Sequence, residues 1–132
     1  MTHPEDILKI DVQDSIAVLT LNRPAKRNAM CDELLGAIDA FFSRPPKDVR
    51  VAVMTGTAGH FCSGLDLSEH VVRSAEATLY HSRNWHGVMD RIQFGGLPVI
   101  SAMFGAVIGG GLELATSTHV RIAEPSTIFQ LP

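Results

Sequence analysis

The sequence predicts a single α/β domain over residues 1–132, because short apolar runs typical of strands alternate with longer amphipathic segments typical of helices. A strand–turn–helix pattern recurs at 49–80 and again at 98–118, which indicates a repeated supersecondary unit. The length of 132 residues suits one domain, and the hydrophobic fraction of 45% excludes a disordered chain.

Each expected element follows from hydrophobic spacing and from the turn residues around it. Gln13-Asp14 suits a hairpin turn, Pro45-Pro46 ends a helix, and Gly95-Gly96 ends a longer one. The expected strands cover 8–12, 15–21, 49–54, 98–104, 119–123 and 127–129. The expected helices cover 30–42 and 69–94, and a short helix begins within 112–117, after a glycine-rich turn at 105–111.

Charge and cysteine content exclude several classes of protein. The net charge of −3 and the lack of a Lys/Arg run argue against nucleic-acid binding, and no apolar run is long enough to cross a membrane. The acidic N-terminus does not resemble a signal peptide. Two cysteines, Cys31 and Cys62, are expected to be reduced thiols in a cytoplasmic protein. The histidines at 60, 70, 81 and 86 lack zinc-site spacing, so no metal site is expected.

The most informative stretch is the glycine run at 105–111 with Glu113 beside it. Glycines between a strand and a helix serve either close helix packing or the exposure of backbone N–H groups to a ligand, and both interpretations stay open. Glu113 is either an acid that compensates the helix dipole or a group for general acid–base chemistry. A Rossmann-like turn followed by Glu124 is a rival interpretation, although Leu114 replaces its last glycine.

A second turn, Phe61-Cys62-Ser63-Gly64-Leu65-Asp66-Leu67, also follows a strand and leads toward a helix. Cys62 is interpreted as an apolar filler and Asp66 as a helix cap. Alternatively, this turn supplies a backbone N–H that meets one from the glycine run, and together they form an oxyanion hole.

These two turns resemble the signature segments of the crotonase superfamily, the enoyl-CoA hydratase/isomerase family. The loop Leu21-Asn22-Arg23-Pro24-Ala25-Lys26-Arg27-Asn28-Ala29-Met30 resembles the family's N-terminal loop, and the three segments occur in family order over about residue 8 to the end. The resemblance implies a ClpP/crotonase-like spiral of repeated β-β-α units. It also implies binding of acyl-CoA thioesters, with coenzyme A as part of the substrate and no separate cofactor.

The resemblance also assigns roles to single residues. The N–H groups of Leu65 and Gly110 would stabilise an enolate, and Glu113 matches the first catalytic glutamate. Tyr80 and Trp85 fall in a segment that often covers the acyl group, although Trp85 also suits the core. The implied substrate-binding residues are Lys26, Arg27, Ala29, Ser63, Gly64, Asp66, Leu67 and Gly109.

The chain departs from the family at its end. A second glutamate usually follows the Phe-Gln-x-Pro pattern, and here Phe129-Gln130-Leu131-Pro132 ends the sequence. Family members are about twice as long, so the chain resembles an N-terminal half, truncated before the C-terminal helical region that builds trimers or hexamers. We expect an enoyl-CoA hydratase-like enzyme. Another crotonase reaction (isomerase or hydrolase) and a non-catalytic acyl-CoA- or subunit-binding fragment are the alternatives.

Overall fold

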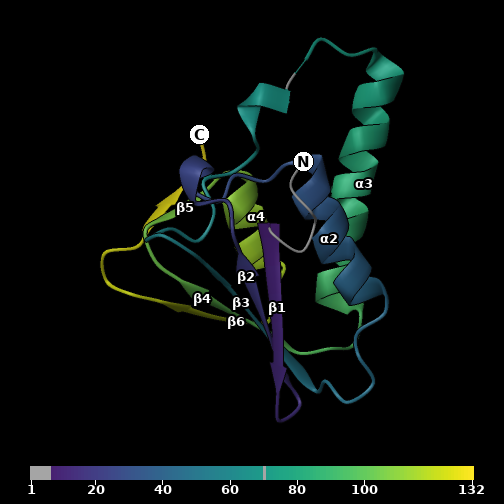
Figure 1. Ribbon diagram of the computed structural model, residues 1–132. Helices are drawn as coiled ribbons and strands as arrows, with labels where there is room; N and C mark the ends of the chain where they lie inside the picture. Colours follow the sequence, from purple (N-terminus) through teal and green to yellow (C-terminus); the bar gives the residue numbers. More distant parts are fainter. Residues whose placement is uncertain (1–6, 70) are drawn as a thin grey trace.

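A computed structural model describes residues 7–69 and 71–132 and confirms the expected α/β fold (Figure 1). Its main sheet has the strand order β1-β2-β3-β4-β6, in which β1 and β2 form an antiparallel hairpin and the remaining pairs are parallel. The strands are β1 Leu8–Gln13, β2 Ile16–Leu21, β3 Val51–Gly56, β4 Val99–Met103 and β6 Val120–Ala123.

A smaller second layer of parallel pairing lies beside the main sheet. It contains β5 Ala106–Ile108 and β7 Ile128–Gln130, and two isolated parallel bridges, Met30 with Leu65 and Cys62 with Val107, extend it. Strands β2, β3 and β4 are therefore each followed by a segment in this second layer and then by a helix. This order confirms the expected repetition of β-β-α units.

The helices are α2 Asp32–Ser43, α3 Ala75–Phe94 and α4 Gly110–Thr116, and two short 3₁₀ helices are η1 Pro24–Lys26 and η2 Leu67–Glu69. Helices α2 and α3 pack against each other beside the main sheet (Figure 1). The Cys31 thiol accepts a hydrogen bond from the Leu34 N–H and so caps α2, because a side-chain acceptor satisfies one of the free donors of the first turn.

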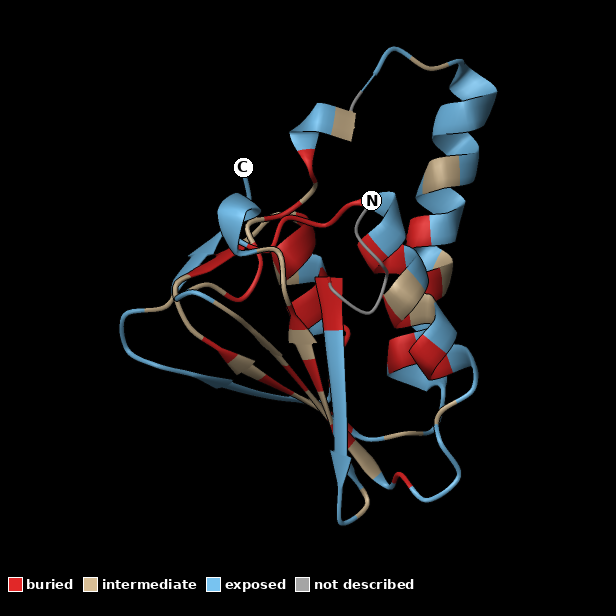
Figure 2. Cartoon of the chain, viewed as in Figure 1, coloured by how far each residue is buried: buried red, intermediate tan, exposed pale blue. Residues whose placement is uncertain are grey.

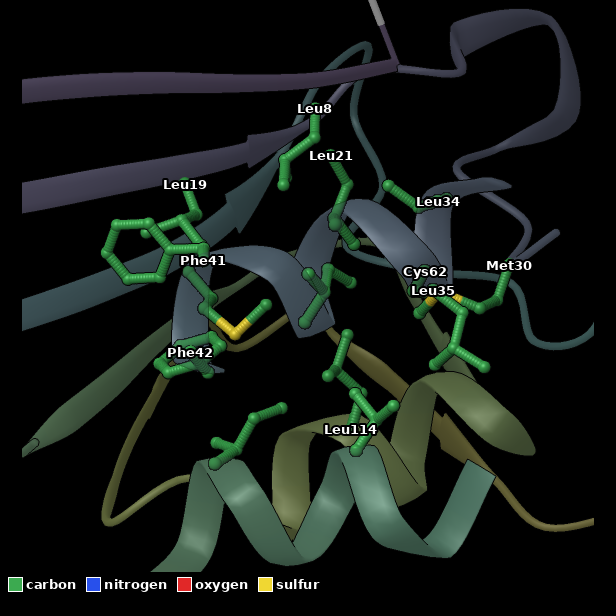
Figure 3. Packing of buried hydrophobic residues seen from close by; sticks show 14 of the residues in the cluster. Leu8, Leu19, Leu21, Met30, Leu34, Leu35, Phe41, Phe42, Cys62 and Leu114 are labelled. Carbon is green, nitrogen blue, oxygen red and sulfur yellow. The ribbon is translucent and has the colours of Figure 1, made fainter. Parts of the chain in front are cut away.

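The core lies between the main sheet and the helices (Figure 3). In this view Leu19 of β2 lies beside Phe41 of α2, Leu21 lies nearer Leu34, and Leu114 of α4 lies on the opposite side of the cluster. Phe41 and Phe42 add an edge-to-face aromatic pair at 5.0 Å between ring centroids. In contrast, the residues of β6 and β7 are exposed (Figure 2).

The structure corrects three of the expected boundaries. The long helix begins at Ala75 rather than at 69, because the Ser74 hydroxyl caps it and η2 ends the preceding segment. The glycine-rich turn contains strand β5, since its N–H groups bond to residues of the turn at 60–62. The hairpin turn lies at Asp14-Ser15, one residue later than expected, and both residues have positive φ.

Helix α4 packs so closely on the second layer that Gly111 cannot carry a side chain. A Cβ atom at Gly111 would overlap the carbonyl oxygen of Cys62, which is backbone and has no easy way to move. By contrast, a Cβ atom at Gly36 in the middle of α2 would meet nothing within 4 Å. Close helix packing is therefore the reason for one glycine of the run.

We expect Gly111→Ala to lower the free energy of unfolding by about 1–3 kcal/mol, because overpacking forces the backbone to shift. The matched control Gly36→Ala should raise it by about 0.5–1 kcal/mol, because alanine costs less conformational entropy in an open helical position. Urea denaturation of both variants measures these changes. A destabilisation of equal size in both variants would contradict the packing argument.

Candidate active site

Leu65 and Gly110 lie side by side because each follows a strand-like segment of the second layer. Cys62 pairs with Val107, and this parallel pairing brings the ends of the two segments to the same edge. A Cβ atom at Gly64 would lie 2.9 Å from the Ile108 oxygen and 3.7 Å from the Gly110 nitrogen. Gly64, which has a φ of 107°, therefore permits the close approach of the two turns.

The backbone N–H groups of Leu65 and Gly110 have no acceptor among the backbone hydrogen bonds of residues 7–69 and 71–132. Gly109 accepts from Leu112 and Glu113, so the helical ladder of α4 does not use the Gly110 N–H. Leu65 and Gly110 also line the same hollow, which has a volume of about 230 Å³. Two unused donors thus border one pocket.

Glu113 lies in the first turn of α4 and lines this hollow together with Trp85. Its Oε2 atom accepts a hydrogen bond from Trp85 Nε1 at 2.5 Å. Trp85 belongs to α3, so the carboxylate is held by a helix distant from it in the sequence. The structure therefore brings together all three predicted catalytic residues.

A second hollow, with a volume of about 100 Å³, adjoins the first. The two share the lining residues Leu65, Thr78, His81 and Trp85. Asp32 and Arg73 add polar groups to the second hollow, and His81 Nε2 lies 3.1 Å from Asp32 Oδ1. Tyr80 is 75% exposed on α3 and lines a third hollow of about 800 Å³, which shares Asp32, Arg73 and His81 with the second.

Two residues that sequence reasoning did not select, Arg23 and Asn28, connect the turns around the site. The fully buried Asn28 donates through Nδ2 to the carbonyl oxygens of Thr57 and His60, and its Oδ1 accepts from the Arg23 N–H. The Arg23 guanidinium donates to the Ala29 carbonyl oxygen. An asparagine in a polar loop was the available sequence signal, since asparagine tolerates a positive φ, which the structure shows at Asn28.

Asp66, one of the predicted substrate-binding residues, is 6% exposed and has partners within the protein. Its Oδ1 accepts from the Ser68 N–H and hydroxyl, and its Oδ2 forms an ion pair with Arg23 at 2.9 Å. The Ser68 hydrogen bond, followed by the Arg23 hydrogen bond, lowers the pKa of Asp66 to about 2. Asp66 therefore caps the short η2 and joins two loops, whereas the long helix toward which the turn leads is capped by Ser74.

The other predicted substrate-binding residues lie on these loops or beside them. The Ser63 N–H donates to the Arg27 carbonyl oxygen, and the Ser63 hydroxyl donates to the Lys26 carbonyl oxygen. Lys26 and Arg27 have exposed side chains, Leu67 is exposed, and Ala29 is buried. Gly109 has a φ of 54°, and its N–H donates to Gln130 of β7.

The remaining candidates have structural roles. Cys62 is completely buried, and this burial raises the pKa of its thiol to about 11, so it is the expected apolar filler. His60 Nδ1 accepts from the Ala106 N–H, whereas His70 lies outside the described residues. No cluster of His, Cys, Asp or Glu in the described ranges is arranged to hold a metal ion. Among the described helices, none is long and apolar enough to span a membrane.

With this geometry in place, comparisons with known proteins identify the family. Residues 11–132 match the model of the enoyl-CoA hydratase/isomerase family, and the chain belongs to that family. The fold and the family together replace the rival interpretation of a dinucleotide-binding module.

Individual relatives agree with this assignment. The chain is 37% identical to probable enoyl-CoA hydratase echA14 of Mycobacterium tuberculosis over 94% of this chain and 49% of the relative. It is 35% identical to 2,3-dehydroadipyl-CoA hydratase of Escherichia coli over 95% of this chain and 49% of that relative. A crystal structure from Rhodopseudomonas palustris, provisionally named an enoyl-CoA hydratase, superposes with a TM-score of 0.94 at 45% identity over 100% of this chain and 51% of that one. The chain thus spans about half the length of the relatives it matches.

The Asp66 interactions predict a pH dependence of stability. A pKa lowered in the folded state means that the stabilisation is complete above the ordinary aspartate pKa of 3.8 and is lost as the pH falls toward about 2. We expect Asp66→Asn to lower the free energy of unfolding by about 1 kcal/mol above pH 4, after allowance for solvent screening. The difference from the unsubstituted protein should shrink between pH 4 and pH 2.

Urea denaturation at several pH values between 2 and 6 measures this difference. Asp11→Asn on the exposed strand β1 is the control, and its effect should be small at every pH. An Asp66→Asn difference that stays constant down to pH 2 would show that the Asp66 charge does not cause the stabilisation.

Proposed function

We propose that this chain carries the thioester-binding and enolate-stabilising part of an enoyl-CoA hydratase. One observation carries the proposal: the backbone N–H groups of Leu65 and Gly110, which have no backbone acceptor in the part of the chain that the structure describes, border the same hollow as the Glu113 carboxylate. A thioester oxygen that accepts from both donors would be stabilised as negative charge develops on it. The membership of the chain in the enoyl-CoA hydratase/isomerase family supports this use of the site.

The proposed reaction adds water across the double bond of a 2-enoyl-CoA. The hydroxyl group bonds to C3, and a proton bonds to C2 after an enolate has formed on the thioester. Glu113 would transfer a proton in this sequence as a general acid–base group, since its carboxylate lies at the pocket wall. The fixed donors of Leu65 and Gly110 would not need to reorganise during the reaction.

The coenzyme A part of the substrate would lie along the loops at 22–30 and 61–67. Lys26 and Arg27 present exposed cationic side chains there, which suits phosphate groups. The backbone contacts between Ser63 and these residues fix the two loops together. The proposal includes no further cofactor, because the substrate itself carries coenzyme A.

We also propose that the whole protein assembles into trimers or hexamers. Exposed apolar side chains on the last two strands support burial of this surface against more protein. They are Val120 and Ile122 of β6 and Ile128 and Phe129 of β7, and Leu131 directly after β7 is exposed as well.

The central test is Glu113→Gln in the protein that contains this chain. We expect the hydration rate of a short 2-enoyl-CoA to fall about 10²–10⁴-fold, because glutamine cannot transfer the proton. The loss of enoyl thioester absorbance measures the rate. Glu33→Gln, an exposed glutamate of α2, is the matched control and should leave the rate unchanged.

A normal rate in Glu113→Gln would contradict the role of Glu113. Binding of the thioester without hydration by the unsubstituted protein would contradict the enzymatic proposal and favour a non-catalytic binding protein.

The loop cations predict a dependence on the substrate phosphates. We expect Lys26→Ala to raise the KM for the enoyl-CoA about 5-fold at low salt, because a charge-assisted contact of about 1 kcal/mol is lost. The KM for the corresponding enoyl-pantetheine, which lacks the nucleotide phosphates, should not change. Lys9→Ala on exposed β1 is the control, and an equal rise in KM for both thioesters would exclude a phosphate contact.

A further inference from the structure

The tryptophan beside Glu113 has two separate contacts with the proposed catalytic groups. Its indole N–H donates to Glu113 Oε2 at 2.5 Å. Its six-membered ring lies against Gly110, where a Cβ atom would stand 3.0 Å from Cζ2 and 3.1 Å from Cη2. One side chain therefore contacts both the carboxylate and the residue that carries a free N–H donor.

Trp85 is itself firmly placed, whereas Glu113 is not. Trp85 is 6% exposed and belongs to the buried face of α3 with Val88, Met89 and Ile92. Glu113 is exposed, and in the described part of the chain its carboxylate has no other hydrogen-bond partner than Trp85. An exposed glutamate samples several rotamers, so a single fixed donor decides where its carboxylate lies.

The chemistry of the contact suits the ionised form of Glu113. An indole nitrogen donates only, and an ionised carboxylate accepts only, so the bond matches one donor to one acceptor. Such a charge-assisted bond is stronger than one between neutral groups. It uses Oε2 and leaves Oε1 without a described partner at the pocket wall.

We propose that Trp85 is a positioning residue, which holds the Glu113 carboxylate at the pocket wall and fixes Gly110 beside it. Trp85 does not itself transfer a proton; it acts through Glu113. This inference rests on the proposed function for its catalytic consequence, whereas the contact itself can be tested without turnover. A glycine is then required at position 110 to make room for Trp85 as well, because a larger residue would displace the indole ring.

The contact is tested first by NMR on the indole N–H of Trp85 in the ¹⁵N-labelled protein. This signal, assigned through the neighbouring protons of α3, should be shifted downfield by its carboxylate acceptor. We expect Glu113→Ala to move this signal upfield, toward that of an unbonded indole. Glu33→Ala on α2 is the control and should leave it in place. An indole signal that is the same with and without the Glu113 side chain would overturn the proposal.

The nearby titratable groups require their own control. His81 and His86 of α3 line the same hollow, and Asp32 of α2 faces His81. The signals are therefore compared at one fixed pH. His86→Gln should leave the difference between the protein with and without Glu113 unchanged, because the bond joins Trp85 to Glu113 alone. Loss of that difference in His86→Gln would contradict the proposal.

The catalytic consequence is tested with Trp85→Phe, which keeps an aromatic ring and removes the N–H. We expect kcat for hydration to fall about 10- to 100-fold with an unchanged KM, because a misplaced catalytic group lowers the rate without weakening binding. Met89→Leu, a volume-conserving change on the same buried face, should keep kcat.

The double variant distinguishes positioning from general damage. If Trp85 acts through Glu113, Trp85→Phe should cause no further loss in the Glu113→Gln background. The proposal would be overturned if the kcat losses of the two single variants multiplied in the double variant, or if Trp85→Phe changed only KM. If the unsubstituted protein shows no hydration, the proposed function fails, and the NMR comparison still decides the contact. The NMR comparison also tests the contact when Trp85→Phe does not fold, because the Glu113→Ala variant retains Trp85.

Discussion

Parallel pairing in the second layer is the constraint on which the site depends. The pairing of Cys62 with Val107 and of Met30 with Leu65 fixes where the turn at 61–67 and the glycine run meet. The backbone donors of Leu65 and Gly110 reach one hollow only because these two turns leave the layer at the same edge. A shift of register by one residue would turn either donor away, since alternate residues of a strand face opposite directions.

The close approach of the two turns explains why glycines are found on both sides of it. Gly64 has a positive φ and faces the Ile108 carbonyl, Gly111 packs on Cys62, and Gly110 lies under the Trp85 ring. The packing explanation of the glycine run is therefore confirmed for Gly111, which lies against Cys62. Exposure of an N–H group to a ligand stays a prediction for Gly110, whose N–H has no backbone acceptor among the described residues.

A network of polar side chains holds together the loops around the site. Asn28 joins the N-terminal loop to the turn after β3, and Arg23 joins it to Asp66. Since Asn28 and Asp66 are buried, each must be satisfied by a partner, and loss of a partner would leave a buried polar group unpaired. The loops that carry Lys26 and Arg27 are thus supported from within the protein while their cationic side chains stay exposed.

The sequence by itself determined the alternation of strands and helices, the buried face of α2 and the two glycine-bearing turns, because these depend on local periodicity and on residues that favour turns. It also selected Leu65, Gly110 and Glu113 through the family resemblance. Only the tertiary structure decided that β5 forms inside the glycine run and that Arg23 and Asn28 connect the loops. The start of α3 at Ala75, in contrast, follows from the local Ser74 cap. The sequence did not decide whether Trp85 belongs to the core or contacts the substrate. The structure shows that it donates a hydrogen bond to Glu113, 28 residues away. Such contacts join segments distant in the chain, so no local pattern of residues specifies them.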